Sequence, residues 1–122
     1  MGVIKILLVE DQQLVREGLK GLLALHDELK VVGEASDGAE ALEWLAAAAA
    51  EDMPDVILSD MRMPRLDGVG LIRALAARAL RLPVILLTTF DDTAAFDEVF
   101  AHILHMSDAL SDGIIKQFPQ KF

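Results

Sequence analysis

Acidic residues that follow apolar runs are the side chains of this sequence best placed to do chemistry. Glu10 and Asp11 come directly after the run VIKILLV at residues 3–9, and Asp60 comes directly after the run VILS. Short apolar runs bounded by polar residues are typical of buried strands. If the ends of these two strands meet, three carboxylates gather there, repel one another and raise one another's pKa until a cation neutralises them.

The residue types favour magnesium as that cation. Magnesium prefers octahedral oxygen ligation, keeps several waters, and takes one or two carboxylates together with a substrate phosphate. Zinc would favour cysteine or histidine; the sequence has no cysteine, and its three histidines are not expected to form a ligand set. We therefore predict a Mg²⁺ site formed by Glu10, Asp11 and Asp60.

The segments that would position these acids alternate along the chain between strand-like and helix-like patterns. The predicted strands cover residues 3–9, 30–35, 55–59 and 84–88. The first two predicted helices cover residues 12–25 and 39–50. Two more are indicated by apolar residues at helical spacing, namely Ile72, Leu75, Ala76 and Ala79 in one and Phe96, Val99, Phe100, Ile103 and Leu104 in the other. This alternation predicts βαβ units with parallel strands, and continuous apolar strands fit a sheet covered on both faces. We therefore predict an α/β fold, a flavodoxin-like doubly wound parallel sheet with strand order 2-1-3-4-5.

Local signals mark where two of these segments begin. Asp37 followed by Glu40 is a capping-box-like start for the helix at 39–50. Pro64 and the pair Asp67–Gly68 mark a loop after the strand at 55–59. The third acid therefore stands at the junction between a strand and a loop.

In the predicted strand order, the two strands that carry the acids are neighbours. Ligands of open parallel sheets gather at the carboxyl ends of the strands, near the reversal of strand order. Thr88 ends the adjacent strand, so its hydroxyl could donate to a phosphoryl oxygen, and a lysine from a fifth strand would add a positive charge. With such neighbours, the Asp60 carboxylate could attack phosphorus as a nucleophile and form an acyl phosphate.

Composition excludes several classes of protein. The 122 residues are enough for one domain with a hydrophobic core, and the net charge of −9 argues against direct nucleic-acid binding, which requires a basic face. No apolar run approaches the ~18 residues needed to span a membrane, and the N-terminus lacks the features of a signal peptide. We therefore expect one domain at residues 1–122 that is soluble, cytoplasmic and not associated with a membrane.

Three segments, LLVEDQQLVREGL, DVILSDMRMPRLDGVGLI and PVILLTTFDD, resemble the receiver domains of bacterial two-component response regulators. The LTTFDD phrase and the VREGL helix are similar to the NarL/FixJ-type subgroup in particular, and the likeness covers residues 3 to about 99. The resemblance implies a CheY-like phosphoacceptor that is not an enzyme, although it could catalyse its own phosphorylation and dephosphorylation. It also implies a cognate sensor histidine kinase as partner and regulation of transcription as the output.

The resemblance further implies a role for each acid and its neighbours. Asp60 matches the phosphoacceptor, and Glu10 and Asp11 match the acidic pair that holds Mg²⁺. Arg62 matches the position that ligates the metal through its backbone carbonyl, and Thr88 matches the switch hydroxyl. Phosphorylation of Asp60 would then change which partners the domain binds.

Residues 100–122 depart from the family pattern. In the family, a lysine follows the fifth strand. The lysine of this sequence near enough to that position is Lys116, which comes after the apolar pair Ile114–Ile115 that could form strand 5. No segment long enough for a fifth helix follows, so helix 5 is missing or rearranged. Either a longer fourth helix lets Lys116 reach the pocket, or the tail is unrelated to the family. A sheet without its last helix would expose apolar surface, which a homodimer or a swapped dimer could cover.

Two alternatives differ from a switching receiver. The displaced lysine and the absence of tyrosine favour a pseudo-receiver, an interaction module that no longer switches. A Mg²⁺-dependent phosphatase or Toprim-like phosphotransferase would carry a second acid two residues after Asp60, where this sequence has Arg62. Phosphorylation would separate these alternatives, whereas Mg²⁺ binding would not. No DNA-binding output domain is expected within these residues.

Overall fold

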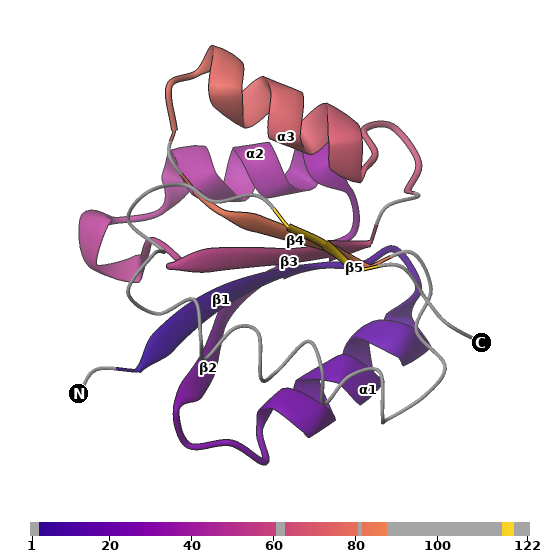
Figure 1. Ribbon diagram of the computed structural model, residues 1–122, viewed down its shortest axis with the longest axis vertical. Coiled ribbons are helices and arrows are strands. Elements are labelled where there is room, and N and C mark those ends of the chain that lie inside the picture. Colours follow the sequence, from indigo (N-terminus) through magenta and orange to yellow (C-terminus); the bar gives the residue numbers. More distant parts are fainter. Residues whose placement is uncertain (1–2, 61–62, 81, 88–115, 119–122) are drawn as a thin grey trace.

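The computed structural model describes residues 3–60, 63–80, 82–87 and 116–118. Within this part of the chain, five strands form one parallel sheet in the order β2-β1-β3-β4-β5 (Figure 1). The strands are β1 (Ile4–Val9), β2 (Leu29–Ala35), β3 (Val56–Asp60), β4 (Val84–Leu87) and β5 (Lys116–Phe118). The predicted fold class and strand order are confirmed.

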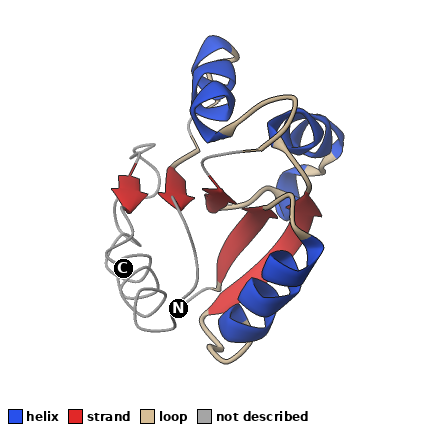
Figure 2. Ribbon diagram, turned by 90° about the vertical axis from the view of Figure 1, so that its right-hand side faces the viewer, coloured by secondary structure: helices blue, strands red, loops and turns tan. Residues whose placement is uncertain are grey.

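Helices cover both faces of this sheet. They are α1 (Gln13–Leu23), α2 (Gly38–Ala47) and α3 (Gly68–Ala77), with a short 3₁₀ turn, η1 (Ala50–Asp52), after α2. The helix α1 lies on one face, and α2 and α3 lie together on the other (Figure 1 and Figure 2). The described part of the chain is therefore a three-layer sandwich, as the continuous apolar strands predicted. None of its helices is long and apolar enough to cross a membrane.

Alternating side chains of the central strands supply two hydrophobic clusters, one on each face. Ile6 and Leu8 of β1 and Leu58 of β3 belong to the cluster with α1, whereas Leu7 and Val9 belong to the cluster with α2 and α3. All five side chains are fully shielded from solvent. Burying one such side chain contributes about 1.5–3 kcal/mol, so β1 and β3 form a rigid base beneath the acids that follow them.

The helix α2 begins with the capping-box-like arrangement that Asp37 and Glu40 predicted, although Glu40 reaches back to the residue before the N-cap Asp37. The Asp37 carboxylate accepts a hydrogen bond from the Glu40 amide (2.9 Å), and the Glu40 carboxylate accepts one from the Ser36 amide (3.3 Å). The helix ends at Ala47 rather than at residue 50, because Ala48 adopts an extended backbone. The helix propensity of the alanine run is a weak effect that the local geometry overrides.

The strand β2 is irregular where α2 approaches it. Ile6 of β1 pairs with Val31 and the next residue, Leu7, pairs with Gly33, so β2 contains one extra residue. The Trp44 side chain of α2 lies over Gly33, and a Cβ at residue 33 would overlap the indole ring. The absence of a side chain at this position therefore allows the close approach.

The fifth strand is present, but its described part differs from the expected position. The sequence placed strand 5 at Ile114–Ile115 with Lys116 after it, whereas β5 is described from Lys116 onward. Residues 114 and 115, the predicted fourth helix and any fifth helix lie outside the described residues. Lys116 is therefore the first described residue of β5 and does not follow the strand.

Candidate functional site

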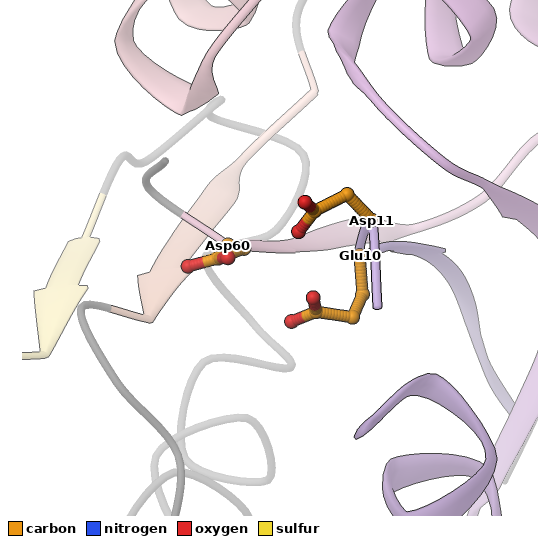
Figure 3. A group of neighbouring side chains, drawn as sticks. All are labelled: Glu10, Asp11 and Asp60. Carbon is orange, nitrogen blue, oxygen red and sulfur yellow. The ribbon is translucent and has the colours of Figure 1, made fainter. Parts of the chain in front are cut away.

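The carboxyl ends of β1 and β3 bring the three predicted acids together. The two strands are neighbours, and their register pairs Val9 with Ser59. Glu10 and Asp60 are the next residues, so they lie at the same level of the sheet. Glu10, Asp11 and Asp60 each offer an oxygen, and these oxygens all lie within 4.8 Å of one another (Figure 3). The predicted convergence of the carboxylates is confirmed.

The acids of this cluster differ in exposure. Glu10 is buried, with 5% of its surface exposed, Asp60 is half-buried and Asp11 is exposed. The Gln12 amide donates to Glu10 Oε2 (2.9 Å), and the amide of Glu10 donates to the Ala35 carbonyl oxygen (3.0 Å). Glu10 is thus held through both its side chain and its backbone, while Asp11 remains accessible to solvent.

Burial raises the pKa of Glu10 to about 7. The hydrogen bond from the Gln12 amide opposes this rise in the pKa, whereas the negative charges of Asp60 and Asp11 add to it. Gathering the carboxylates therefore costs free energy that a bound cation would remove. The atoms that could ligate a metal here are all carboxylate oxygens, which suit a hard cation such as Mg²⁺. Glu10, Asp11 and Asp60 are the residues that would hold it.

Two further residues support the cluster and were missed in the sequence. Arg16 of α1 donates from Nη1 to the Glu10 carbonyl oxygen (2.7 Å), and its Nε lies 3.2 Å from Glu34 Oε1. The buried Ser59 hydroxyl donates to the Asp60 carbonyl oxygen (2.8 Å). The position of Arg16, a cation in the first turns of the helix after the acidic pair, is a signal that could have identified it. Nothing in the sequence distinguishes Ser59 from an ordinary strand residue.

Two other predicted site residues, Arg62 and Thr88, lie outside the described residues. The metal-binding carbonyl of Arg62 and the switch hydroxyl of Thr88 therefore stay predictions from the sequence. Asp60, two residues before Arg62, and Leu87, the residue before Thr88, end adjacent strands of the sheet and pair with each other. The structure thus describes the strand ends from which both segments continue.

The backbone of Lys116 is described, but its side chain is not. Lys116 pairs with Ile85 of β4, whereas Asp60 pairs with Leu87, two residues further along the same strand. The backbone of Lys116 therefore lies two residues short of the sheet edge where the acids meet. Its contact with a phosphoryl group stays a prediction.

Residues 6–118 of the chain match the protein family described as the response regulator receiver domain. The matched span includes Glu10, Asp11 and Asp60 and reaches from β1 to β5. Among solved structures, the signal receiver domain of the response regulator NarL from Mycobacterium tuberculosis superposes with a TM-score of 0.67 and 30% sequence identity. That superposition covers 99% of this chain and 88% of the NarL domain.

Curated relatives of the chain are transcriptional regulators. The chain is 38% identical over 117 residues to the transcriptional regulatory protein LnrK of Bacillus subtilis (strain 168). The aligned residues make up 93% of this chain and 51% of LnrK. It is 40% identical over 100 residues to the DNA-binding transcriptional activator DevR/DosR of Mycobacterium tuberculosis. That alignment covers 81% of this chain and 44% of DevR/DosR. The chain thus spans about half the length of the curated relatives it matches.

Proposed function

Because this chain belongs to the response regulator receiver domain family, we propose that Asp60 is its phosphoacceptor and that a sensor histidine kinase phosphorylates it in the presence of Mg²⁺. Receiver domains of response regulators are phosphoacceptors that switch transcriptional regulators, and they are not enzymes. The observation that carries the assignment is the cluster of Glu10, Asp11 and Asp60 at the carboxyl ends of β1 and β3.

In the proposed reaction, the Asp60 carboxylate is the nucleophile. One of its oxygens attacks the phosphorus of a phosphohistidine and forms a P–O bond, while the P–N bond breaks and the imidazole leaves with the electron pair and takes up a proton. Glu10 and Asp11 would hold the metal, and Arg16 would fix the backbone of Glu10 beneath it. When bound, Mg²⁺ would neutralise negative charge on the phosphoryl oxygens.

Three further groups complete the proposed site. The carbonyl of Arg62 would be a metal ligand, the hydroxyl of Thr88 would donate to a phosphoryl oxygen, and the ammonium of Lys116 would add a positive charge. Phosphorylation would shift the domain between two states through the contact with Thr88.

The curated relatives suggest the wider setting. Since they are transcriptional regulators about twice as long as this chain, we propose that residues 1–122 form one receiver domain that controls transcription in the cytoplasm. The domain itself would not bind nucleic acid, because its net charge of −9 disfavours contact with phosphate backbones. A homodimer is a further proposed assembly, in which a second copy covers apolar surface of the sheet.

Intact mass spectrometry after incubation with Mg²⁺ and acetyl phosphate tests the phosphoacceptor. The parent should gain one phosphoryl group, and Asp60→Asn should gain none, because an amide lacks the nucleophilic oxygen. Asp67→Asn is the matched control: Asp67 caps α3 by accepting a hydrogen bond from the Gly70 amide, and asparagine caps helices as well, so this variant should be phosphorylated like the parent. Chelation of the metal should abolish the reaction.

Two results would contradict the proposal. A parent that binds Mg²⁺ but gains no phosphoryl group would be a pseudo-receiver. A phosphoryl group that still appears on Asp60→Asn would show that another side chain is the acceptor.

A further inference from the structure

The loop between β3 and α3 is docked on the start of α2 through Arg65. Arg65 follows Asp60 by five residues and has a φ of 64°, in the left-handed region that residues with a side chain rarely adopt. Among the described residues other than glycine, only Ala79 shares such a conformation. A backbone of this kind persists where surrounding contacts impose it, and it is common at functional sites.

The contact that holds Arg65 is a forked ion pair with Asp37. Arg65 Nε donates to Asp37 Oδ2 (2.7 Å), and Arg65 Nη2 donates to Asp37 Oδ1 (3.1 Å). The Asp37 side chain is only 6% exposed, and its Oδ1 also accepts the capping bond from the Glu40 amide. Burial by itself would raise the pKa of Asp37, but the bonds from Arg65 and Glu40 outweigh burial and leave this pKa below its ordinary value. The carboxylate is therefore charged at neutral pH.

A second contact of the same loop lies beside the ion pair. The Gly38 amide donates to the Leu66 carbonyl oxygen (2.8 Å). A Cβ at residue 38 would lie 2.6 Å from that oxygen, so a larger residue would displace the loop. Two consecutive loop residues, Arg65 and Leu66, are thus docked on two consecutive residues, Asp37 and Gly38.

The turn before α2 also contacts Arg16, the side chain that holds the backbone of Glu10. Arg16 Nη1 donates to the Glu10 carbonyl oxygen (2.7 Å) and to the Ser36 hydroxyl (3.4 Å). Residues 36–38 therefore connect to Glu10 through Arg16, and to the loop after Asp60 through Arg65. This turn is therefore linked, through Arg16 and Arg65, to the segments that follow both β1 and β3, whose acids form the cluster.

We propose that the ion pair between Arg65 and Asp37 positions the acidic cluster: it docks the loop after Asp60 on α2 and so holds the carboxylates in the geometry that binds a divalent cation. The inference rests on the Mg²⁺ binding of the proposed function. Arg65 acts through the loop and does not touch the cation. A lysine can replace it only in part, because a guanidinium alone donates two parallel hydrogen bonds to one carboxylate.

Calorimetric titration of the full chain with Mg²⁺ tests this inference, with urea unfolding measured on the same samples. Arg65→Met removes the charge and the forked donor, and we expect its Mg²⁺ affinity to fall about tenfold, as is typical when a residue that supports metal ligands is lost. Asp37→Asn should weaken Mg²⁺ binding similarly, although asparagine still caps α2. Arg65→Lys should recover part of the affinity.

Two control variants separate the ion pair from other effects. Arg73→Met removes an exposed arginine of α3 and should bind Mg²⁺ like the parent. Arg65→Gly relieves the left-handed backbone while it removes the guanidinium. Mg²⁺ affinity should fall in Arg65→Gly as it does in Arg65→Met. Retained affinity in the glycine variant would overturn the inference, because the backbone conformation would then suffice.

The remaining outcomes distinguish this inference from the proposed function. If Arg65→Met and Asp37→Asn bind Mg²⁺ as tightly as the parent, the ion pair stabilises the fold only and the inference is overturned, whatever the unfolding free energies. If the parent itself binds no Mg²⁺, both are overturned. If the parent binds Mg²⁺ but accepts no phosphoryl group, the proposed function alone fails.

Discussion

Glu10 is the residue on which the electrostatics of the acidic cluster depend most. Its carboxylate is buried beside Asp11 and Asp60, and its pKa is raised to about 7. Near neutral pH the group is therefore about half protonated. Protons and metal ions compete for the same oxygens, so the affinity for a cation must depend on pH.

We expect Mg²⁺ to bind about tenfold more weakly at pH 6 than at pH 8, because below the raised pKa the metal must displace a proton from Glu10. The affinity should rise with pH and level off above the pKa. Calorimetric titration at both pH values measures the difference. Glu10→Gln cannot titrate and should bind Mg²⁺ weakly at both. Equal affinity of the parent at the two pH values would contradict the raised pKa.

At the scale of elements, α2 links the packing of the core to the site. Its first residues receive the loop that follows Asp60, and its Trp44 ring lies over Gly33 of β2. Gly33 stands where β2 gains an extra residue relative to β1, and such irregularities bend a strand locally. The position of α2 on the sheet therefore depends on a residue without a side chain.

Gly33→Ala should lower the free energy of unfolding by about 1–3 kcal/mol, because the added methyl overlaps the Trp44 ring and the site is overpacked. Trp44 is the only tryptophan, so its fluorescence should change as well. Urea unfolding followed by this fluorescence measures both effects. Gly18→Ala on α1 is the matched control: nothing lies within 4 Å of the added Cβ, so it should stabilise the protein by about 0.5–1 kcal/mol. Equal stability of Gly33→Ala and the parent would contradict the close approach of α2.

At the scale of the whole molecule, the cluster makes global stability depend on pH. The folded state keeps a proton on Glu10 up to a pKa of about 7, whereas the ordinary pKa of the group is 4.5. Between these two values Glu10 binds a proton more readily in the folded state than in the unfolded state, so its contribution to stability falls as pH rises through this window. Without a cation, the contribution of Glu10 to stability is therefore smallest at the pH values where its carboxylate is ionised and can bind one.

In the presence of a metal chelator, Glu10→Gln should be more stable than the parent at pH 8 by on the order of 1–3 kcal/mol, and this advantage should vanish near pH 4.5. The variant removes the charge whose burial is unfavourable. Urea unfolding at both pH values measures the difference. Glu28→Gln removes the carboxylate of an exposed glutamate before β2 and is the matched control for the loss of a carboxylate that is not buried. A stability difference that does not grow with pH would count against the buried charge as its cause.

The sequence by itself determined the parallel sheet, its strand order and the meeting of Glu10, Asp11 and Asp60. The strands and the acids at their ends follow from local patterns, namely apolar runs of strand length and turn residues between them, and the strand order is that of the flavodoxin-like fold that the alternation of elements favours. A parallel sheet brings the carboxyl ends of its strands to one edge, so the position of an acid in the sequence already predicts its place in the fold. The capping signal of Asp37 and Glu40 was local in the same way.

Only the tertiary structure decided what holds those acids in place. Arg65 and Asp37 are 28 residues apart in sequence, and the bond from Arg16 to Glu10 depends on how α1 packs on the sheet. The backbone position of Lys116 is of the same kind, since a strand of three residues carries too little side-chain pattern to specify its register. A charged side chain has many compatible partners along the chain, and the packing of helices on the sheet selects the one that lies within hydrogen-bonding distance.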